Sequence, residues 1–248
     1  LRFISLGSGS SGNSYYLSTP AGGILIDAGI GYRTLKNHFH TFGIRPEEIR
    51  AVLITHDHAD HIKSVGKLAS DFGIPIYATA LVHEGIGRNY CVSPHLSADQ
   101  KVYIEIDKPF TVAGLQVTPF AVPHDSTECV GYRVEEGGVR FALITDIGHI
   151  TDEVREEVSQ ANYLVLESNH DIDMLRHNEH YSQTLKNRIL GRSGHLCNEA
   201  CGEALWLLYQ TGVRHAVLGH LSHENNTPEL ALRTVCESLQ AHGLEIGR

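Results

Sequence analysis

The chain has 248 residues, of which 42% are hydrophobic, and this is enough for one sizeable folded core. Its formal net charge is −9, from 20 basic and 29 acidic side chains, which argues against loose electrostatic binding of nucleic acid over the whole surface. No stretch of about 18 apolar residues occurs, so the sequence predicts no membrane-spanning helix.

The chain begins with LRFISLGSG, which lacks the basic and then apolar pattern of a secretory signal. The five cysteines are odd in number and follow no disulfide or zinc spacing. Cys197 and Cys201 are four residues apart in a predicted helix, a spacing that allows a shared face. We therefore expect reduced, mostly buried thiols in a cytoplasmic protein.

The first predicted turn lies in the glycine-rich stretch LGSGSSGNSYYL. This stretch lacks the Gly-Lys-Ser/Thr ending of a Walker A loop and the spacing of a dinucleotide fingerprint. The residues that follow alternate as in a hairpin, which favours a turn between two strands. The alternative is a loop whose backbone N–H groups face an anion, with Ser10, Ser11 and Asn13 as candidate substrate contacts.

Short apolar, β-branched runs recur along the chain and end abruptly at polar residues, as in GGILID, AVLITH and FALITD. Such runs, bounded by glycine or polar turns, are typical of buried strands. Polar groups at the ends of buried strands gather on one rim of a sheet, where layered α/β proteins usually bind ligands. The polar residues in question are Asp27, His56, His58, His124, Asp146, Glu167 and His220.

Helical patterns lie between these strands, and several end in glycine, as helix C-termini often do. Thr227 is a candidate N-cap, with Pro228 at the first helical position. The patterns cover residues 31–43, 61–73, 151–160, 182–191, 198–212 and 227–243. Residues 101–143 are predicted to form consecutive antiparallel strands, and strand runs with helices outside them suggest helix–sheet–sheet–helix layers.

The segment THDHADH, residues 55–61, concentrates three histidines and two aspartates directly after an apolar run. It is too short to wrap four ligands around one tetrahedral ion, but it can offer one pair of ligands to each of two ions. Imidazole and carboxylate suit Zn²⁺, and also Mn²⁺ or Fe. Further ligands must come from other strand ends, where His124, Asp146 and His220 stand, and a carboxylate such as Asp146 can bridge two cations.

THDHADH matches the T-H-x-H-x-D-H motif of the metallo-β-lactamase-fold superfamily, and the resemblance extends over essentially the whole chain. It implies an α/β fold, a four-layer αββα sandwich of two mixed sheets with helices on the outer faces, as one domain over residues 1–248. It also implies two divalent metal ions, Zn²⁺ or Mn²⁺, with Fe as a further option. By this resemblance the first ion binds His56, His58 and His124, the second binds Asp60, His61 and His220, and Asp146 bridges them, with Asp27 orienting the motif from behind.

Two such ions can share a hydroxide and polarise the substrate oxygen, which supports hydrolysis of phosphodiesters, thioesters, lactones or lactams. Many true β-lactamases carry Cys where this chain has Asp146, and this disfavours lactamase activity. Glu167 and His195 loosely resemble the Glu and His pair of tRNase Z, which orients a proton donor. His195 is therefore a candidate general acid or phosphate contact, with Glu167, His170 and Asp60 as further catalytic candidates.

Lys186, Arg188 and Arg192 lie just before His195, but they do not all share one helix face. They are either a solvated helix end or a local patch that contacts phosphates on an otherwise acidic protein. His223 is either an ordinary loop histidine or another substrate contact.

LGSGSSGNSYYL, ESNHD, GHLCNEA and LGHLSHENNTPELA together resemble the YycJ/WalJ-type subfamily of bacterial metallohydrolases. This resemblance implies a metal-dependent phosphodiesterase with DNA as its partner, most similar to a 5′–3′ exonuclease that uses a metal-bridging hydroxide. One alternative is an acyl hydrolase for thioesters or lactones on the same fold. Another is a non-catalytic metal- or nucleotide-sensing protein, although a structural metal site is normally closed and needs no shared water.

Overall fold

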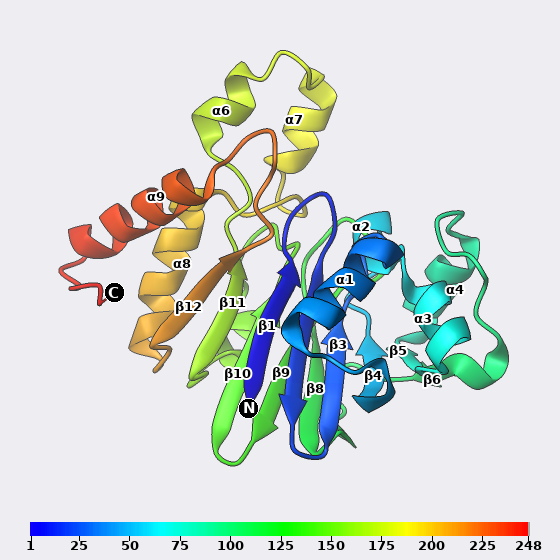
Figure 1. Ribbon diagram of the computed structural model, residues 1–248. Helices are drawn as coiled ribbons and strands as arrows, with labels where there is room; N and C mark the ends of the chain where they lie inside the picture. The colour runs from blue at the N-terminus through cyan, green and yellow to red at the C-terminus, as the bar shows by residue number, and fades with distance from the viewer. Residues whose placement is uncertain (248) are drawn as a thin grey trace. The chain divides into compact units, whose positions relative to one another are not determined.

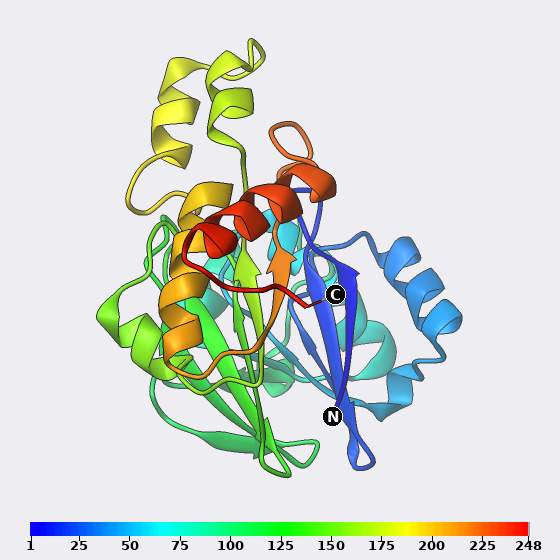
Figure 2. The ribbon, with the colours of Figure 1, turned by 90° about the vertical axis from the view of Figure 1, so that its left-hand side faces the viewer.

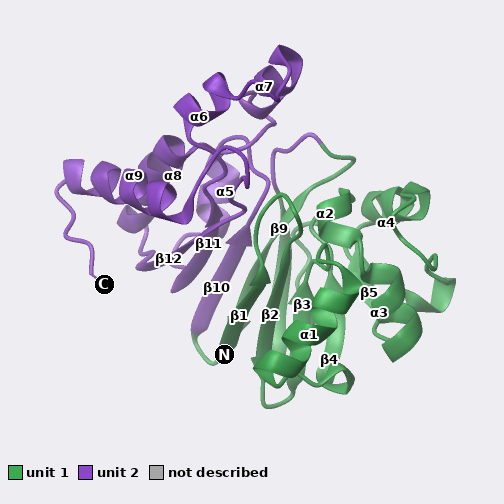
Figure 3. Ribbon diagram, turned by 45° about the horizontal axis from the view of Figure 1, so that its top comes forward, with its two compact units in different colours: residues 1–121, 126–138 green, residues 122–125, 139–248 purple. Residues whose placement is uncertain are grey.

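The computed structural model describes residues 1–247. The chain divides into two compact units, which are shown in Figure 3. Unit 1 comprises residues 1–121 and 126–138, and unit 2 comprises residues 122–125 and 139–248. No described helix is long and apolar enough to cross a membrane.

The first sheet lies in unit 1 and has the strand order β1-β2-β3-β4-β5-β6. Its first three strands are antiparallel and the next three run parallel to β3, so the sheet is mixed. The strands are β1 (Arg2–Gly7), β2 (Ser14–Thr19), β3 (Gly22–Ile26), β4 (Ile49–Leu53), β5 (Ile76–Ala78) and β6 (Lys101–Tyr103). The glycine-rich stretch is the turn between β1 and β2, as the alternation predicted.

The second sheet has the order β12-β11-β10-β9-β8-β7 and is also mixed. In unit 1, the strands β7 (Phe110–Val112), β8 (Leu115–Ala121) and β9 (Val130–Glu136) pair antiparallel. In unit 2, the strands β10 (Val139–Ile144), β11 (Tyr163–Glu167) and β12 (His215–Gly219) pair parallel. These two mixed sheets with their helices are the fold class that the sequence predicted.

Unit 1 also carries α1 (Tyr32–Phe42), α2 (Ala59–Ile62), α3 (Val65–Phe72), α4 (Ala80–Arg88) and the short 3₁₀ turns Pro46–Glu48 and Ala98–Gln100. Unit 2 carries α5 (Asp152–Glu157), α6 (Ile172–His177), α7 (Gln183–Ile189), α8 (Asn198–Gln210) and α9 (Pro228–Ala241). In Figures 1 and 2, α6 and α7 project beyond the strands of unit 2, whereas α8 and α9 lie side by side near β12.

Local sequence accounts for most of these elements. Consecutive side chains of β3 and β4, such as Leu25 and Leu53, are fully buried, which is why parallel strands appear as continuous apolar runs. Gly43 ends α1 in the left-handed conformation that glycine adopts without steric cost. Thr227 caps α9 by accepting a hydrogen bond from the backbone N–H of Leu230, 3.1 Å away, as predicted.

Some predicted helices and strands differ in the structure. The helix expected over residues 61–73 is broken, because the Ser64 backbone N–H and hydroxyl bond to the carbonyls of Ala28 and Ile30. β6 pairs parallel with β5 and does not belong to the antiparallel series. The crossover helix between them, α4, was missed because its sequence ALVHEGIGR contains two glycines, which weaken helix propensity.

The cysteine prediction was partly wrong. All five cysteines are free thiols, as expected. Cys197, however, lies outside α8 and caps it, because its Sγ accepts a hydrogen bond from the backbone N–H of Ala200. It therefore does not share a helix face with Cys201, whose burial raises its thiol pKa.

Candidate metal centre

Unit 1 gathers four of the predicted ligands in the turn between β4 and α2. The ring of His56 lies 4.6 Å from that of His58 and 4.1 Å from that of His61, measured between centroids. Asp60 stands in the first turn of α2, next to His61. A single short turn therefore brings three imidazoles and a carboxylate together, as THDHADH predicted.

Asp27, directly after β3, holds this turn from behind. Its carboxylate accepts hydrogen bonds from the Thr55 backbone N–H and hydroxyl, both at 2.9 Å, and from His61 Nδ1 at 2.7 Å. Burial raises the pKa of Asp27, and its interactions with His61 and Thr55 oppose that rise. Because Nδ1 of His61 is engaged, the ring offers Nε2 as its ligand atom.

Asn13 has a different place from the substrate contact expected of it. Its side chain is fully buried, so no surface is left for a substrate. Its amide bonds to both the N–H and the carbonyl of Gly9, and its backbone N–H donates to the Asp60 carbonyl at 2.8 Å. The amide nitrogen also lies 3.0 Å from His61 Nε2, a contact that a metal bound at this atom would replace. Ser10 and Ser11, in the same loop, are exposed.

Unit 2 places the remaining three predicted ligands at strand ends. His124 follows β8, Asp146 follows β10 and His220 follows β12. One oxygen of Asp146 lies 3.7 Å from His124 Nε2 and 3.4 Å from His220 Nδ1. His124 Nδ1 donates to the Gly194 carbonyl at 3.1 Å, which leaves Nε2 as the ligand atom of this ring.

Glu167, the last residue of β11, links His220 to His195. Its Oε1 accepts hydrogen bonds from His220 Nδ1 at 2.6 Å and from His195 Nδ1 at 2.8 Å. Its Oε2 accepts from the backbone N–H groups of Ile147 and Leu196, at 2.8 and 3.1 Å. The structure thus brings together Glu167 and His195, which the sequence paired. N–H groups donate all four of these hydrogen bonds to the Glu167 carboxylate.

These contacts shift the pKa values of Glu167 and His195. Burial alone would raise the pKa of Glu167, but its charge interaction and hydrogen bond with His195, followed by those with His220, lower it to about 2. Burial likewise opposes a charge on His195, yet the Glu167 carboxylate raises the His195 pKa above its ordinary value. The carboxylate is therefore ionised at neutral pH, and an ionised carboxylate only accepts hydrogen bonds.

Three of these residues have a strained backbone. Asp27, Asp146 and His220 have φ of 60°, 55° and 51°, in the left-handed region that side chains other than glycine seldom adopt. Asp27 and Asp146 come after strands whose last residues are buried, whereas β12, before His220, is largely exposed and not the buried strand that the sequence predicted. Such strain persists where the surrounding structure enforces it, and it clusters at functional sites.

A network of buried asparagines explains the motifs ESNHD, CNEA and HENN. The Asn226 amide donates to the carbonyls of Ser168 and Asn169 and exchanges hydrogen bonds with Asn198. Asn169 in turn donates to the His220 carbonyl at 2.9 Å. The sequence indicated only that Asn226 shapes a turn; its buried amide in fact fastens the segments that carry Glu167, His195 and His220.

His170, a catalytic candidate from the sequence, is a buried side chain of unit 2. Its Nδ1 lies 3.3 Å from the Asn169 side-chain oxygen, and its Nε2 has no hydrogen-bond partner among residues 1–247. Burial lowers its pKa to about 4, so the ring is neutral at neutral pH. This geometry gives it no contact with the proposed ligands.

The basic side chains before His195 do not form a free cationic patch. Arg188 pairs with Asp125, and Lys186 donates to the Arg176 carbonyl at 2.7 Å. Arg192 lies 3.4 Å from His149 Nε2. Each side chain therefore has a local structural partner, which favours the helix-end interpretation over the phosphate patch. His223 is highly exposed beside Glu224, at 3.5 Å.

The donor set in the two units fits a zinc- or manganese-type ion. His61, His124 and His220 each have Nδ1 fixed by a carboxylate or a backbone carbonyl, the arrangement that metal-ligating histidines usually show. Neutral imidazoles and carboxylates are the ligands that these ions take in hydrolases. Thr55 and Gly194 are supporting residues that the sequence reasoning missed; Thr55 could have been noticed as the first residue of the T-H-x-H motif.

Comparison with known proteins identifies the family of this chain. The beta-lactamase superfamily domain matches residues 23–221. The exodeoxyribonuclease YycJ of Bacillus anthracis is 34% identical over 247 residues, covering 100% of this chain and 92% of the relative. The exodeoxyribonuclease WalJ of Streptococcus pneumoniae is 35% identical, covering 99% of this chain and 91% of the relative.

Solved structures share the fold. Zinc-bound PqqB from Methylobacterium extorquens superposes with a TM-score of 0.76 at 21% identity, covering 97% of this chain and 95% of that one. The short form of human tRNase Z superposes with a TM-score of 0.65 at 18% identity, covering 89% and 92% of the two chains. The chain belongs to the metallo-β-lactamase-fold superfamily of metal-dependent hydrolases, in the group that includes the YycJ and WalJ proteins.

Proposed function

We propose that the protein is a dinuclear phosphodiesterase that degrades DNA from its ends, in the manner of a 5′–3′ exonuclease. The ions would be Zn²⁺ or Mn²⁺, held by the histidines and aspartates that the sequence predicted. His56, His58 and His124 would hold one ion, Asp60, His61 and His220 the other, and Asp146 would contact both. The fixed orientation of three imidazole rings supports this assignment: Asp27 holds His61, Glu167 holds His220, and the Gly194 carbonyl holds His124.

The observation that carries the phosphodiesterase assignment is the contact between Glu167 and His195. Phosphodiester cleavage expels an alkoxide, which needs a proton, and an imidazolium held by a carboxylate is suited to provide it. The whole-chain similarity to two exodeoxyribonucleases supports DNA as the substrate. A thioester, in contrast, expels a thiolate, whose thiol has a pKa of about 8.5, so a thioesterase would depend less on such a donor.

The two ions, when bound, supply the attacking oxygen nucleophile and stabilise negative charge on the phosphoryl group. Side chains of the protein itself supply the proton for the leaving oxygen. Glu167 keeps Nδ1 of His195 protonated, so the proton available for the leaving oxygen is the one on Nε2. The same carboxylate fixes the ring of His220, which couples the proton donor to the ligand set.

The test is degradation of 5′-phosphorylated single-stranded and duplex DNA with Mn²⁺ or Zn²⁺, using His58→Ala as the inactive control. We expect metal-dependent release of nucleotides from 5′ ends and about two ions per chain in carefully prepared protein. Blocking the 5′ end or labelling the 3′ end would report the direction. Failure to cleave DNA with any metal, together with ready hydrolysis of a thioester or lactone, would refute the nuclease assignment.

A further inference from the structure

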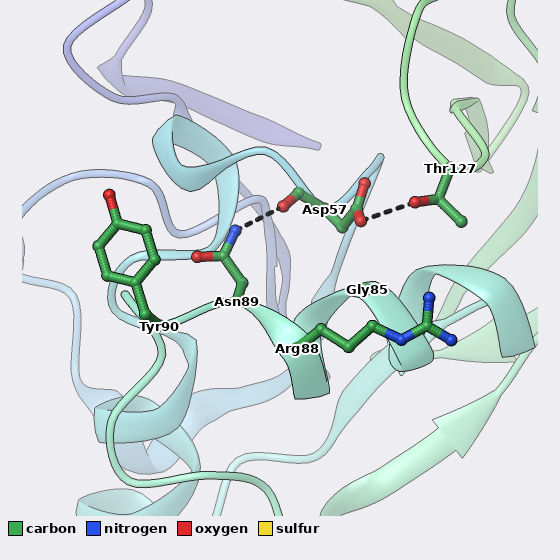
Figure 4. Close-up of a pocket in the computed structure, with 6 residues that line it drawn as sticks. All are labelled: Asp57, Gly85, Arg88, Asn89, Tyr90 and Thr127. Carbon is green, nitrogen blue, oxygen red and sulfur yellow. Dashed lines mark hydrogen bonds between the residues drawn. The ribbon is translucent and has the colours of Figure 1, made fainter.

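A pocket of unit 1 lies beside the turn between β4 and α2, and none of the proposed metal ligands lines it. It has a volume of about 310 Å³, and Asp57, Gly85, Arg88, Asn89, Tyr90 and Thr127 line it (Figure 4). Asp57 is the residue between His56 and His58, so the pocket begins one residue away from two proposed ligands. Its volume is in the range of small-molecule sites, which starts at about 300 Å³.

The pocket wall holds Asp57 in a fixed position. Thr127 donates its hydroxyl to Asp57 Oδ2 at 2.9 Å, and the Asn89 amide donates to the Asp57 carbonyl at 3.0 Å. Gly85 is required there, because an added Cβ would lie 1.9 Å from Asp57 Oδ2. Oδ1 of Asp57 has no hydrogen-bond partner within the described part of the chain, residues 1–247, and remains an acceptor at the pocket wall.

Two exposed side chains of different chemistry complete the pocket. Tyr90 is 94% exposed, more than any other large hydrophobic side chain among residues 1–247. Arg88 is also exposed, and its guanidinium forms a surface ion pair with Glu84 in the same helix, at 2.8 Å. In Figure 4 the Arg88 guanidinium lies on the side of Thr127, and Tyr90 lies on the opposite side, beyond Asn89.

We propose that this pocket binds one nucleotide of the DNA strand next to the bond that is cleaved. This inference rests on the proposed nuclease function. Tyr90 would stack on the base, since base–aromatic stacking is the usual anchor for unpaired nucleotides. Arg88 would contact a backbone phosphate, and the Asp57 carboxylate would accept a hydrogen bond from an exocyclic amino group, as acidic side chains do with cytosine.

The geometry carries two consequences for the substrate. A base that stacks on Tyr90 must leave the duplex, so frayed or single-stranded ends should be preferred to blunt paired ends. Thymine offers no exocyclic amino group to an acceptor, whereas cytosine does. Ends rich in thymine should therefore bind less tightly than ends rich in cytosine.

The experiment compares two substrates with the metal-loaded protein. Bis(p-nitrophenyl) phosphate reports the metal chemistry without a base, and a short 5′-phosphorylated single-stranded oligonucleotide reports strand binding. Tyr90→Ala should raise the KM for the oligonucleotide about five- to hundredfold, with little change for the small phosphodiester. Tyr90→Phe should restore the KM, because it keeps the ring. Tyr103→Ala, which removes another exposed tyrosine of unit 1 outside the pocket, is the matched control.

The outcomes separate the two proposals. If the wild-type protein cleaves the oligonucleotide and Tyr90→Ala leaves its KM unchanged, the pocket assignment is wrong and the nuclease assignment stands. Turnover of the small phosphodiester without any turnover of oligonucleotides would overturn both the DNA substrate and the pocket. A loss equal for both substrates would also overturn the pocket, because it would indicate damage to the metal centre. Asp57→Asn should reduce the preference for cytosine-rich over thymine-rich ends.

Discussion

Replacing Glu167 by glutamine tests how far the proposed metal centre depends on a residue outside the proposed ligand set. The substitution keeps the shape of the side chain, yet a glutamine has one carbonyl oxygen and one NH₂ group. The carboxylate accepts two imidazole N–H bonds on Oε1 and two backbone N–H bonds on Oε2. The glutamine amide accepts hydrogen bonds only through its carbonyl oxygen. Its NH₂ group would therefore face the other pair of N–H groups, which would have no acceptor.

Either orientation of the amide damages the site. If its NH₂ group faces the rings, Nδ1 of His220 must accept, and the ring proton moves to Nε2, the proposed ligand atom. If it faces the backbone, two buried N–H groups lose their partner. Hydrogen bonds to charged groups contribute about 1.5–3 kcal/mol each, so the loss of two amounts to on the order of 3 kcal/mol.

We expect Glu167→Gln to lower metal affinity and kcat by about 10–100-fold, the usual cost of removing a group that orients metal ligands. Metal affinity would be measured by chelator competition, and kcat by DNA degradation. Glu203→Gln is the matched control, because Glu203, at an exposed position of α8, also accepts a hydrogen bond from a histidine, His242, which follows α9. Retention of metal and of kcat within about twofold in Glu167→Gln would refute the reasoning.

Further perturbations follow from the same geometry. Asp27→Asn should release His61 Nδ1 and lower the metal content toward one ion per chain; unchanged content would contradict the role given to Asp27. His195→Ala should lower kcat about 10²–10⁴-fold with metal content intact, and loss of metal instead would make His195 a ligand. Gly29→Ala should cost about 1–3 kcal/mol in the free energy of unfolding, because its Cβ would lie 1.5 Å from the Asp60 carbonyl oxygen; a neutral result in chemical denaturation would argue against this packing. Removal of metal with EDTA should abolish cleavage and lower the midpoint of thermal unfolding, and re-addition of Mn²⁺ should restore both; a midpoint independent of metal would argue against bound ions.

The sequence predicted the elements that depend on local physics. Continuous apolar runs located the buried strands, and Thr227, Pro228 and Gly43 marked helix ends through short-range hydrogen bonds and backbone preference. Elements with weak local signals were missed. α4 contains two glycines, and α6 has only six residues, fewer than a reliable helical pattern needs.

The candidate site shows the same division. The motif THDHADH and the polar strand ends were visible in the sequence, because a buried strand that ends in a charged or imidazole side chain is costly unless that side chain has a role. The sequence could not show that Glu167 serves both His195 and His220, or that Asn226 holds three segments together. These contacts join residues far apart in the chain.

The sequence by itself therefore determined the superfamily and the fold class, since periodicity and the T-H-x-H-x-D-H spacing act over a few residues, and the metal ligands remain its prediction. Only the tertiary structure decided what each neighbouring side chain does. Asn13, read as a substrate contact, is a buried brace, and Asp57, the unassigned position within the motif, faces a pocket beside Tyr90. The physical reason is that burial and hydrogen-bond partners are set by chain segments that meet only after folding, and no local pattern encodes them.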